Sequence, residues 1–109
     1  MAATYKVLGQ VNPSATTATS LYTVGAGKSA VISTITVCNQ ASTTATYRIA
    51  IRPAAATLAA LHYISYDATV AANDTTAITI GVTLAATDVV TVYASSGTLS
   101  FNAFGSEIS

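Results

Sequence analysis

The fold class is decided by the stretch Thr75-Thr76-Ala77-Ile78-Thr79-Ile80-Gly81-Val82-Thr83-Leu84. Apolar and small polar residues alternate along it, and successive residues of a strand point to opposite sides. The stretch therefore predicts a strand whose core-facing residues are Ile78, Ile80, Val82 and Leu84. Its other side carries only small uncharged residues, namely Ala77, Thr79, Gly81 and Thr83. Such a flat face suits close packing against another chain, and it is equally consistent with a threonine-rich face in solvent.

The same alternation recurs along the whole chain, with Val, Ile, Tyr and Thr in strand-like positions and little helical spacing. Turn-forming residues separate the segments. Eight strands are predicted, over Tyr5–Val11, Ser20–Val24, Ser29–Asn39, Thr46–Arg52, His62–Asp67, Thr75–Leu84, Val89–Ser95 and Thr98–Phe104. Short strands at this regular spacing predict one all-β domain over residues 1–109, an antiparallel β-sandwich or jelly roll.

Two neighbouring segments differ in pattern. In the predicted strand 46–52, Tyr47, Ile49 and Ile51 share one face, while Arg48 and Arg52 share the other. The following stretch, 53–61, is rich in alanine, shows no alternation and is long enough for two helical turns. A helix this short is marginal in water by itself. We therefore interpret 53–61 as a long crossover between two halves of the sandwich.

Charge is scarce in this chain of 109 residues. Four Lys+Arg balance four Asp+Glu, and only 7% of residues are charged, against about 25% in ordinary soluble domains. Hydrophobic residues make up 51%, the mean hydropathy is +0.55, and Ala, Ser and Thr together account for 52 residues. This composition excludes a disordered chain. A neutral, weakly charged surface protects poorly against self-association, so we expect the chain to work in an assembly.

The same composition argues against several partners. The four cations are Lys6, Lys28, Arg48 and Arg52. They are too few for the basic stripe that nucleic acid requires. Residues 1–7 lack a charged region followed by a long apolar one, so no signal peptide is expected. No apolar run approaches the roughly 18 residues that a membrane span needs, so no membrane partner is expected and the chain should begin in the cytosol.

Candidate catalytic and metal-binding residues are isolated from one another. Cys38, the single cysteine, lies in an apolar run and is predicted to be a buried small side chain. His62, the single histidine, is predicted to lie at one end of a strand and to make a local hydrogen bond; the alternative is a small hydrolase that uses it as a base. Asp67, Asp74 and Asp88 each follow or precede a strand, as turn-forming residues do. We therefore predict no enzyme, no metal site and no cofactor.

One glycine-rich stretch, 25–29, invites comparison with a phosphate-binding loop. That loop needs a further glycine five positions before its Gly-Lys-Ser, and Tyr22 stands there. It also needs a following helix, whereas a β-branched strand follows here. We interpret the stretch as a turn between strands. Asn73-Asp74-Thr75 matches a glycosylation signal, and without a secretion signal we interpret it as a turn as well.

Tyrosine is the only other residue type that suggests binding. A carbohydrate site in a β-sandwich usually offers an aromatic platform, and Tyr63 and Tyr66 are the two candidates for one. The alternative is that the tyrosines fill the edge of the core while their hydroxyls reach water.

Several stretches together resemble a family of small virion proteins of tailed bacteriophages. The residues that carry the likeness are Leu21–Val24, Ala30–Asn39, Tyr47–Pro53, His62-Tyr63, Ala72–Thr75 and Leu99–Gly105. The resemblance spans most of the chain and consists of β-sandwich patterning more than of a diagnostic motif. It implies a structural protein that decorates and cements a capsid, or one that forms part of a tail or fibre.

From this resemblance we expect a capsid cement protein in the virion, made in the host cytoplasm. It would be a homotrimer seated where subunits of the major capsid protein meet, and it would stabilise the head shell against the pressure of the DNA. Its partners would be the major capsid protein and copies of itself. The alternative is a tail or fibre component that binds host surface glycans through Tyr63, Tyr66 and the loop around Asn73.

Overall fold

The structure is a computed structural model that describes residues 3–109. The described residues form eight strands and two short 3₁₀ turns, η1 (Pro53–Ala55) and η2 (Ala60–His62). The strands are β1 (Ala3–Val11), β2 (Thr19–Thr23), β3 (Ser29–Asn39), β4 (Ala45–Arg52), β5 (Tyr63–Val70), β6 (Thr75–Leu84), β7 (Val89–Ala94) and β8 (Leu99–Ile108). Each of the eight predicted strands corresponds to one of these, and most boundaries agree within about two residues.

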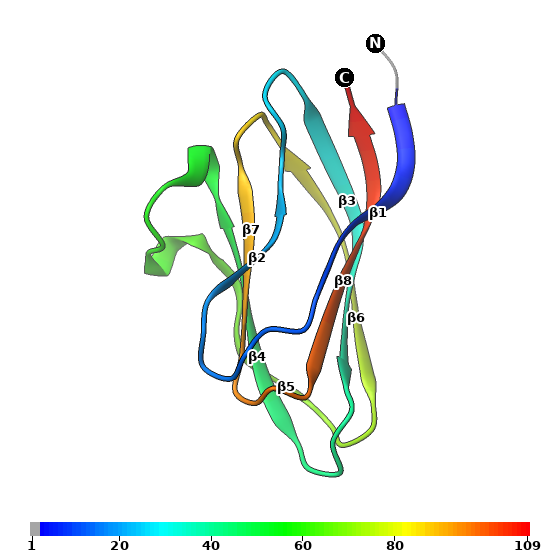
Figure 1. The fold of residues 1–109 in the computed structure, drawn as a ribbon, viewed down its shortest axis with the longest axis vertical. Coiled ribbons are helices and arrows are strands. Elements are labelled where there is room, and N and C mark those ends of the chain that lie inside the picture. Colours follow the sequence, from blue (N-terminus) through cyan, green and yellow to red (C-terminus); the bar gives the residue numbers. More distant parts are fainter. Residues whose placement is uncertain (1–2) are drawn as a thin grey trace.

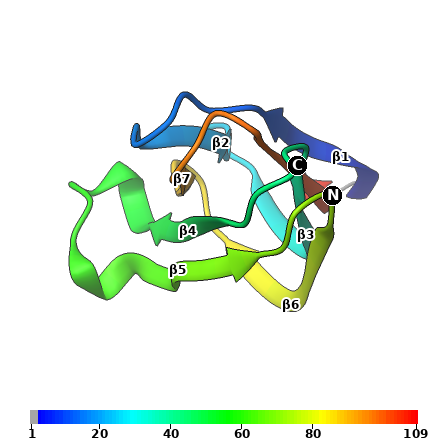
Figure 2. The ribbon, with the colours of Figure 1, turned by 90° about the horizontal axis from the view of Figure 1, so that it is seen from below.

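The strands build two four-stranded sheets with the orders β1-β8-β3-β6 and β2-β7-β4-β5. All pairings within them are antiparallel. The sheets face each other as two layers (Figures 1 and 2). The chain alternates between the layers at every connection except β4 to β5. This is the double Greek key of a jelly roll, which confirms the fold expected from the sequence.

Strand β3 lies in the middle of the first sheet and pairs with both β8 and β6. Its inward side chains are fully buried, and they are Ala30, Ile32, Ile35, Val37 and Asn39. Across the sandwich they share one core with the inward residues of β4 and β7, including Tyr47, Ile49, Val90 and Val92. The ring of Tyr47 meets that of Phe101 edge-on, with 6.3 Å between their centroids. One continuous apolar layer therefore holds the two sheets together.

The predicted core residues are mostly confirmed. Tyr47 and Ile49 are buried, and Ile51 is half-buried against the same core. In β6, Leu84 is buried, while Ile78 and Val82 are half-buried and pack against the core.

The prediction for Ile80 is wrong, because its side chain is 41% exposed. Val82 pairs with Ile32 and Thr79 pairs with Thr34, so Ile80 and Gly81 together face a single residue of β3. At this β-bulge Ile80 has no direct partner on β3, and it stays exposed although Ile78 and Val82 on either side pack against the core.

Cys38 is also placed differently from the prediction. Its neighbours Val37 and Asn39 are buried, whereas Cys38 itself is only half-buried. It pairs with Ser100 and Thr75 on the outer side of the sheet. The apolar run made both faces of β3 look buried, while only alternate residues of the strand reach the core.

The stretch after β4 forms the turns η1 and η2, joined by an extended segment. Because β4 and β5 are neighbours in one sheet, this stretch does not cross between the halves of the sandwich, and that expectation is wrong. It folds instead over the outer side of its own sheet. Arg52 fastens it there, donating hydrogen bonds to the carbonyls of Ala55 and Ala56. Among residues 3–109 no helix has the length and apolar character to traverse a bilayer.

Candidate functional site

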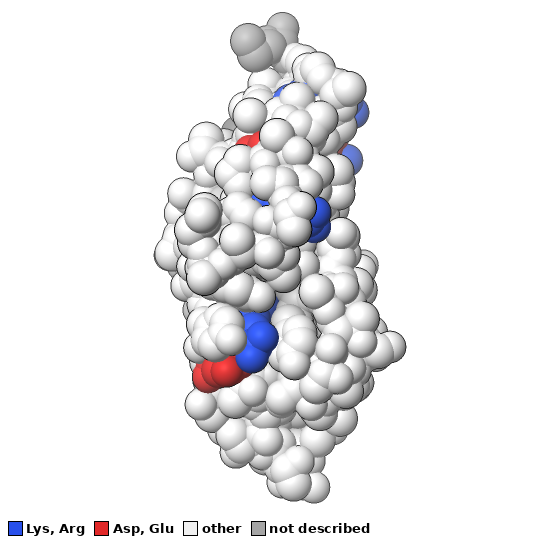
Figure 3. Space-filling view, turned by 90° about the vertical axis from the view of Figure 1, so that its left-hand side faces the viewer, with Lys and Arg blue, Asp and Glu red and all other residues white. Residues whose placement is uncertain are grey.

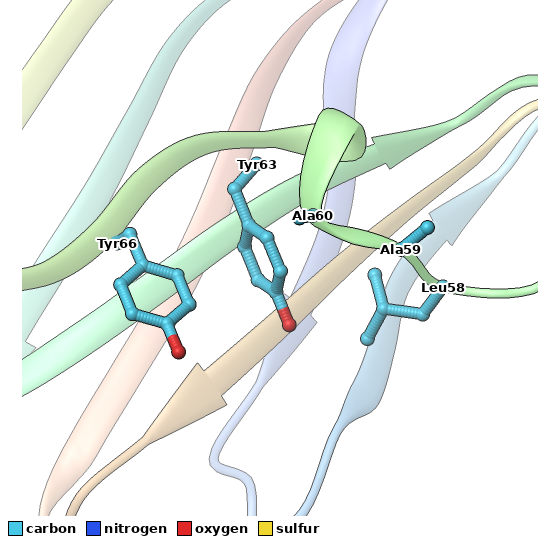
Figure 4. Close-up of a pocket in the computed structure, with 5 residues that line it drawn as sticks. All are labelled: Leu58, Ala59, Ala60, Tyr63 and Tyr66. Atoms are coloured by element: carbon cyan, nitrogen blue, oxygen red, sulfur yellow. The ribbon is translucent and has the colours of Figure 1, made fainter.

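A concave surface lies beside β5, on the outer side of the β2-β7-β4-β5 sheet. We call it the tyrosine pocket; it has a volume of about 620 Å³ and is lined by Leu58, Ala59, Ala60, Tyr63 and Tyr66. Tyr63 and Tyr66 lie edge to face, with 4.9 Å between their ring centroids. Both rings project from the same side of β5, and their hydroxyls point the same way (Figure 4). The volume is within the range of small-molecule sites.

Next to the pocket, the guanidinium of Arg48 is held between two aromatic rings. Its central carbon is 4.1 Å from the ring centroid of Tyr66 and 4.3 Å from that of Tyr93. Its Nε donates to Asp67 Oδ1 over 2.7 Å, and its Nη2 donates to Oδ2 over 3.3 Å. This paired hydrogen bonding raises the pKa of Arg48 above its ordinary value. We call these four residues, Arg48, Tyr66, Asp67 and Tyr93, the arginine cluster.

Sheet register explains how the arginine cluster forms. Tyr93 of β7 is the direct cross-strand partner of Arg48. On the other side, Tyr47 pairs with Ala68 and Ile49 with Ser65, so Tyr66 and Asp67 both lie opposite Arg48. This bulge requires a left-handed backbone at Asp67 (φ 52°), which aspartate tolerates better than most residues. One extra residue in β5 thus gives the guanidinium both a ring to stack on and a carboxylate to pair with.

The chemistry that this surface offers is binding. It combines exposed aromatic faces with hydroxyls and a charge pair of zero net charge, the features that hold a ring-shaped polar ligand. His62 lies at the end of η2, is 8% exposed, and its Nδ1 accepts a hydrogen bond from the backbone amide of Ala59 over 3.0 Å. The local hydrogen bond predicted for His62 is therefore confirmed. In the described chain no serine or carboxylate is hydrogen-bonded to this ring.

The aspartates serve the backbone and Arg48. Asp74 Oδ1 accepts a hydrogen bond from the Thr75 amide over 2.8 Å, and Asp88 accepts from the amides of Ala54 and Ala85, both over 2.9 Å. Their predicted role in turns is confirmed, whereas Asp67 pairs with Arg48 instead. Residues 3–109 contain no group of three or more His, Cys, Asp or Glu side chains that could hold a metal ion.

A second group of charged residues lies near the C-terminal end of β8. Glu107 of β8 accepts a hydrogen bond from the Tyr22 hydroxyl over 2.7 Å, and it lies 3.3 Å from Lys6 Nζ and 3.5 Å from Lys28 Nζ. The hydrogen bond from Tyr22, reinforced by both lysines, holds the pKa of Glu107 below its ordinary value. Burial and the same hydrogen bond raise the pKa of Tyr22. Lys28 follows a turn between β2 and β3, as predicted for residues 25–29.

The structure brings together only part of the site expected for glycan binding. Tyr63 and Tyr66 do share one pocket, as expected. Asn73 follows the far end of β5 and belongs to a different turn, where its amide bonds the carbonyl of Ala41. Arg48 and Tyr93 were missed as site residues. One signal for Arg48 was available from the sequence, its predicted outward placement. The contacts of Arg48 with Tyr66 and Tyr93 depend on the register of β5 and β7 against β4, which the sequence does not show.

Searches against protein-family models, curated proteins and solved structures find no match for this chain. The class that can be stated is therefore the one that the fold itself defines. The chain is a jelly-roll β-sandwich with an aromatic pocket on one of its two outer faces.

The cluster formed by Glu107, Tyr22, Lys6 and Lys28 predicts that the folded protein loses stability at both acidic and alkaline pH. A carboxylate whose pKa is lowered on folding stabilises the fold above its ordinary pKa, and this contribution disappears as the pH falls below about 4. A phenol whose pKa is raised on folding, as in Tyr22, stabilises the fold until the pH exceeds about 10. Burial also raises the pKa of Tyr47, so the alkaline loss has two sources.

Melting temperatures measured across this range test the assignment. Glu107→Gln should lower the melting temperature at neutral pH and flatten the acidic decline, and Tyr22→Phe should flatten part of the alkaline decline. An acidic decline of unchanged steepness in Glu107→Gln would show that other carboxylates cause it.

Proposed function

We propose that this chain is a structural protein of a tailed-bacteriophage virion, a capsid cement protein that stabilises the head shell through contacts with the major capsid protein and with copies of itself. The trimer expected from the sequence belongs to this proposal. The resemblance to small phage virion proteins suggests this class of function, and the jelly-roll fold is compatible with it, since viral capsid proteins use this architecture widely.

The observation that carries the proposal is that the four cationic side chains already have partners within the chain. Lys6 and Lys28 pair with Glu107, and Arg48 pairs with Asp67. Arg52, the fourth cation, donates to two carbonyls and to the Thr91 hydroxyl. Charged groups are correspondingly few and scattered in the space-filling view of the β2-β7-β4-β5 side (Figure 3).

Such a surface suits contact with protein. Removing charges from water is costly, and less so where each charge already has a partner; here the chain has few charges, and its four cations have partners within the chain. Phosphate binding, in contrast, depends on cations that are free to face the ligand. The surface therefore favours close, dry packing against protein subunits.

Copy number in the virion tests the proposal. Quantitative mass spectrometry of purified particles should find this chain in hundreds of copies, in a fixed ratio to the major capsid protein. Particles assembled without the chain should release their DNA at a lower temperature than complete particles. A handful of copies per particle, or unchanged heat stability, would contradict a cementing role.

The tyrosine pocket favours a second candidate function, a tail or fibre component that binds host surface glycans. A sugar ring stacks on exposed aromatic faces, and the rings of Tyr63 and Tyr66 are already held edge to face at the pocket. Tyr66 is 59% exposed, so a ligand can reach it.

Adsorption of phage to host cells tests this alternative. Under it, the double variant Tyr63→Ala/Tyr66→Ala should abolish adsorption without changing the heat stability of the particle. Leu61→Ala is a matched control, because Leu61 is an 82% exposed apolar residue of η2 that does not line the pocket. Normal adsorption by the double variant would remove the best site for glycan binding.

A further inference from the structure

The outer side of the β1-β8-β3-β6 sheet differs from that of the other sheet. Directly paired residues of neighbouring strands share a face, so the register assigns every side chain named below except that of Gly81, which has no direct partner and alternates with the inward Val82. We call this outer side the bare face. Its residues are Ala3, Tyr5, Val7 and Gln10 of β1; Ser100, Asn102, Phe104, Ser106 and Ile108 of β8; Ser29, Val31, Thr34, Thr36 and Cys38 of β3; and Thr75, Ala77, Thr79, Gly81 and Thr83 of β6.

None of these residues is charged. Lys6 of the edge strand β1 and Glu107 of its neighbour β8 alternate to the inner side, where they meet Tyr22 and Lys28. The β2-β7-β4-β5 sheet, in contrast, carries Arg48 and Asp67 outward, and residues 53–62 fold over part of it. The outer face of the β2-β7-β4-β5 sheet therefore carries charges and is partly covered by residues 53–62, whereas the bare face has neither feature.

The bare face has two halves of different shape. On the β1-β8 half, Tyr5 is 85% and Val7 46% exposed, and Phe104 and Ile108 are half-buried. On the β6 half, the small residues Ala77, Thr79, Gly81 and Thr83 are all exposed. Bulky apolar side chains therefore project from one half, and the other half is low and flat.

We propose that copies of this chain associate through the bare face, with the β1-β8 half of one copy against the β6 half of the next. Where two copies meet, a charge that faces a like charge is unfavourable. The bare face contains no charge that could be opposed in this way. The same pairing of unlike halves occurs about a threefold axis or about a twofold axis.

The size of the face is sufficient for such a contact. The molecule measures 45 × 28 × 20 Å, and the two sheets lie side by side when viewed down the shortest axis (Figure 1). Each outer face is therefore bounded by the 45 Å and 20 Å dimensions, or about 900 Å². A stable interface buries about 800 Å² on each partner. A twofold contact covers the whole face of each copy and reaches that size, whereas a threefold arrangement divides the face between two neighbours. The small half lies at the edge strand β6, a ten-residue strand without charge or proline to prevent contact with another chain.

The test adds one arginine at each of three positions. A Cβ added at Gly81 meets no atom within 4 Å, and the residue is exposed, so Gly81→Arg changes the β6 half with room for its side chain to extend into solvent. Tyr5→Arg changes the opposite half at a residue that is 85% exposed. Gly97 is equally open but lies in the turn between β7 and β8, so Gly97→Arg is the matched control with the same added charge.

Association is measured for the purified protein, without any virion component, by sedimentation and light scattering at tens of micromolar. Wild type and Gly97→Arg should have masses about two or three times that of the 11.0 kDa chain. Gly81→Arg and Tyr5→Arg should associate about 100-fold more weakly, because each introduces an unpaired charge into a dry contact. Circular dichroism should show the same β structure in all four proteins.

Three results would overturn the proposal: an 11.0 kDa wild-type monomer at these concentrations, equal association of all four proteins, or equal loss in Gly97→Arg. The proposal names the surface for the contacts between copies in the proposed function, and the two can fail separately. A self-associating chain found in few copies per particle would contradict only the cementing role, and an abundant monomeric chain would contradict only the bare-face contact.

Discussion

The inward row of β3 is the feature on which the rest of the sandwich depends. This strand pairs on both sides, and its buried residues from Ala30 to Asn39 supply the middle of the first sheet and its share of the core. A close approach accompanies it, since a Cβ at Gly105 of β8 would collide with the carbonyl of Val31. With that row fixed, alternation assigns the outward residues of β8 and β6 as well. The uncharged composition of the bare face is thus a direct consequence of the register of β3.

The few charges of the chain act mainly within it. Glu107 gathers Lys6, Lys28 and Tyr22 at one end of the sandwich, and Asp67 holds Arg48 between two tyrosines on the β2-β7-β4-β5 sheet. As a result the two outer faces have different characters. One presents rigid aromatic rings around a neutral ion pair, and the other presents an uncharged sheet with bulky residues at one end. The first suits a small polar ligand, and the second suits a protein surface.

Local pattern was enough to predict the eight strands, the sandwich and most of the core, because period-two alternation and turn residues report directly on strands. The errors occur where register decides the outcome. Ile80 and Asp67 both lie at bulges, which place two residues opposite one and cannot be identified from composition. The half-buried position of Cys38 could not be predicted, because the apolar run does not show which alternate residues of β3 face inward. Tyr93 lies 45 positions from Arg48, and only the pairing of β4 with β7 brings them together.

Two tyrosines on opposite sheets allow the central claim to be tested directly. Tyr5 is 85% exposed on the bare face, and Tyr66 is 59% exposed beside the tyrosine pocket. Hydroxyl-radical footprinting compares their oxidation in dilute and in concentrated protein. If copies cover the bare face, oxidation of Tyr5 falls as the protein assembles while that of Tyr66 stays constant. Protection of Tyr66 with Tyr5 unchanged would show that the other sheet is the one covered, and it would contradict this account.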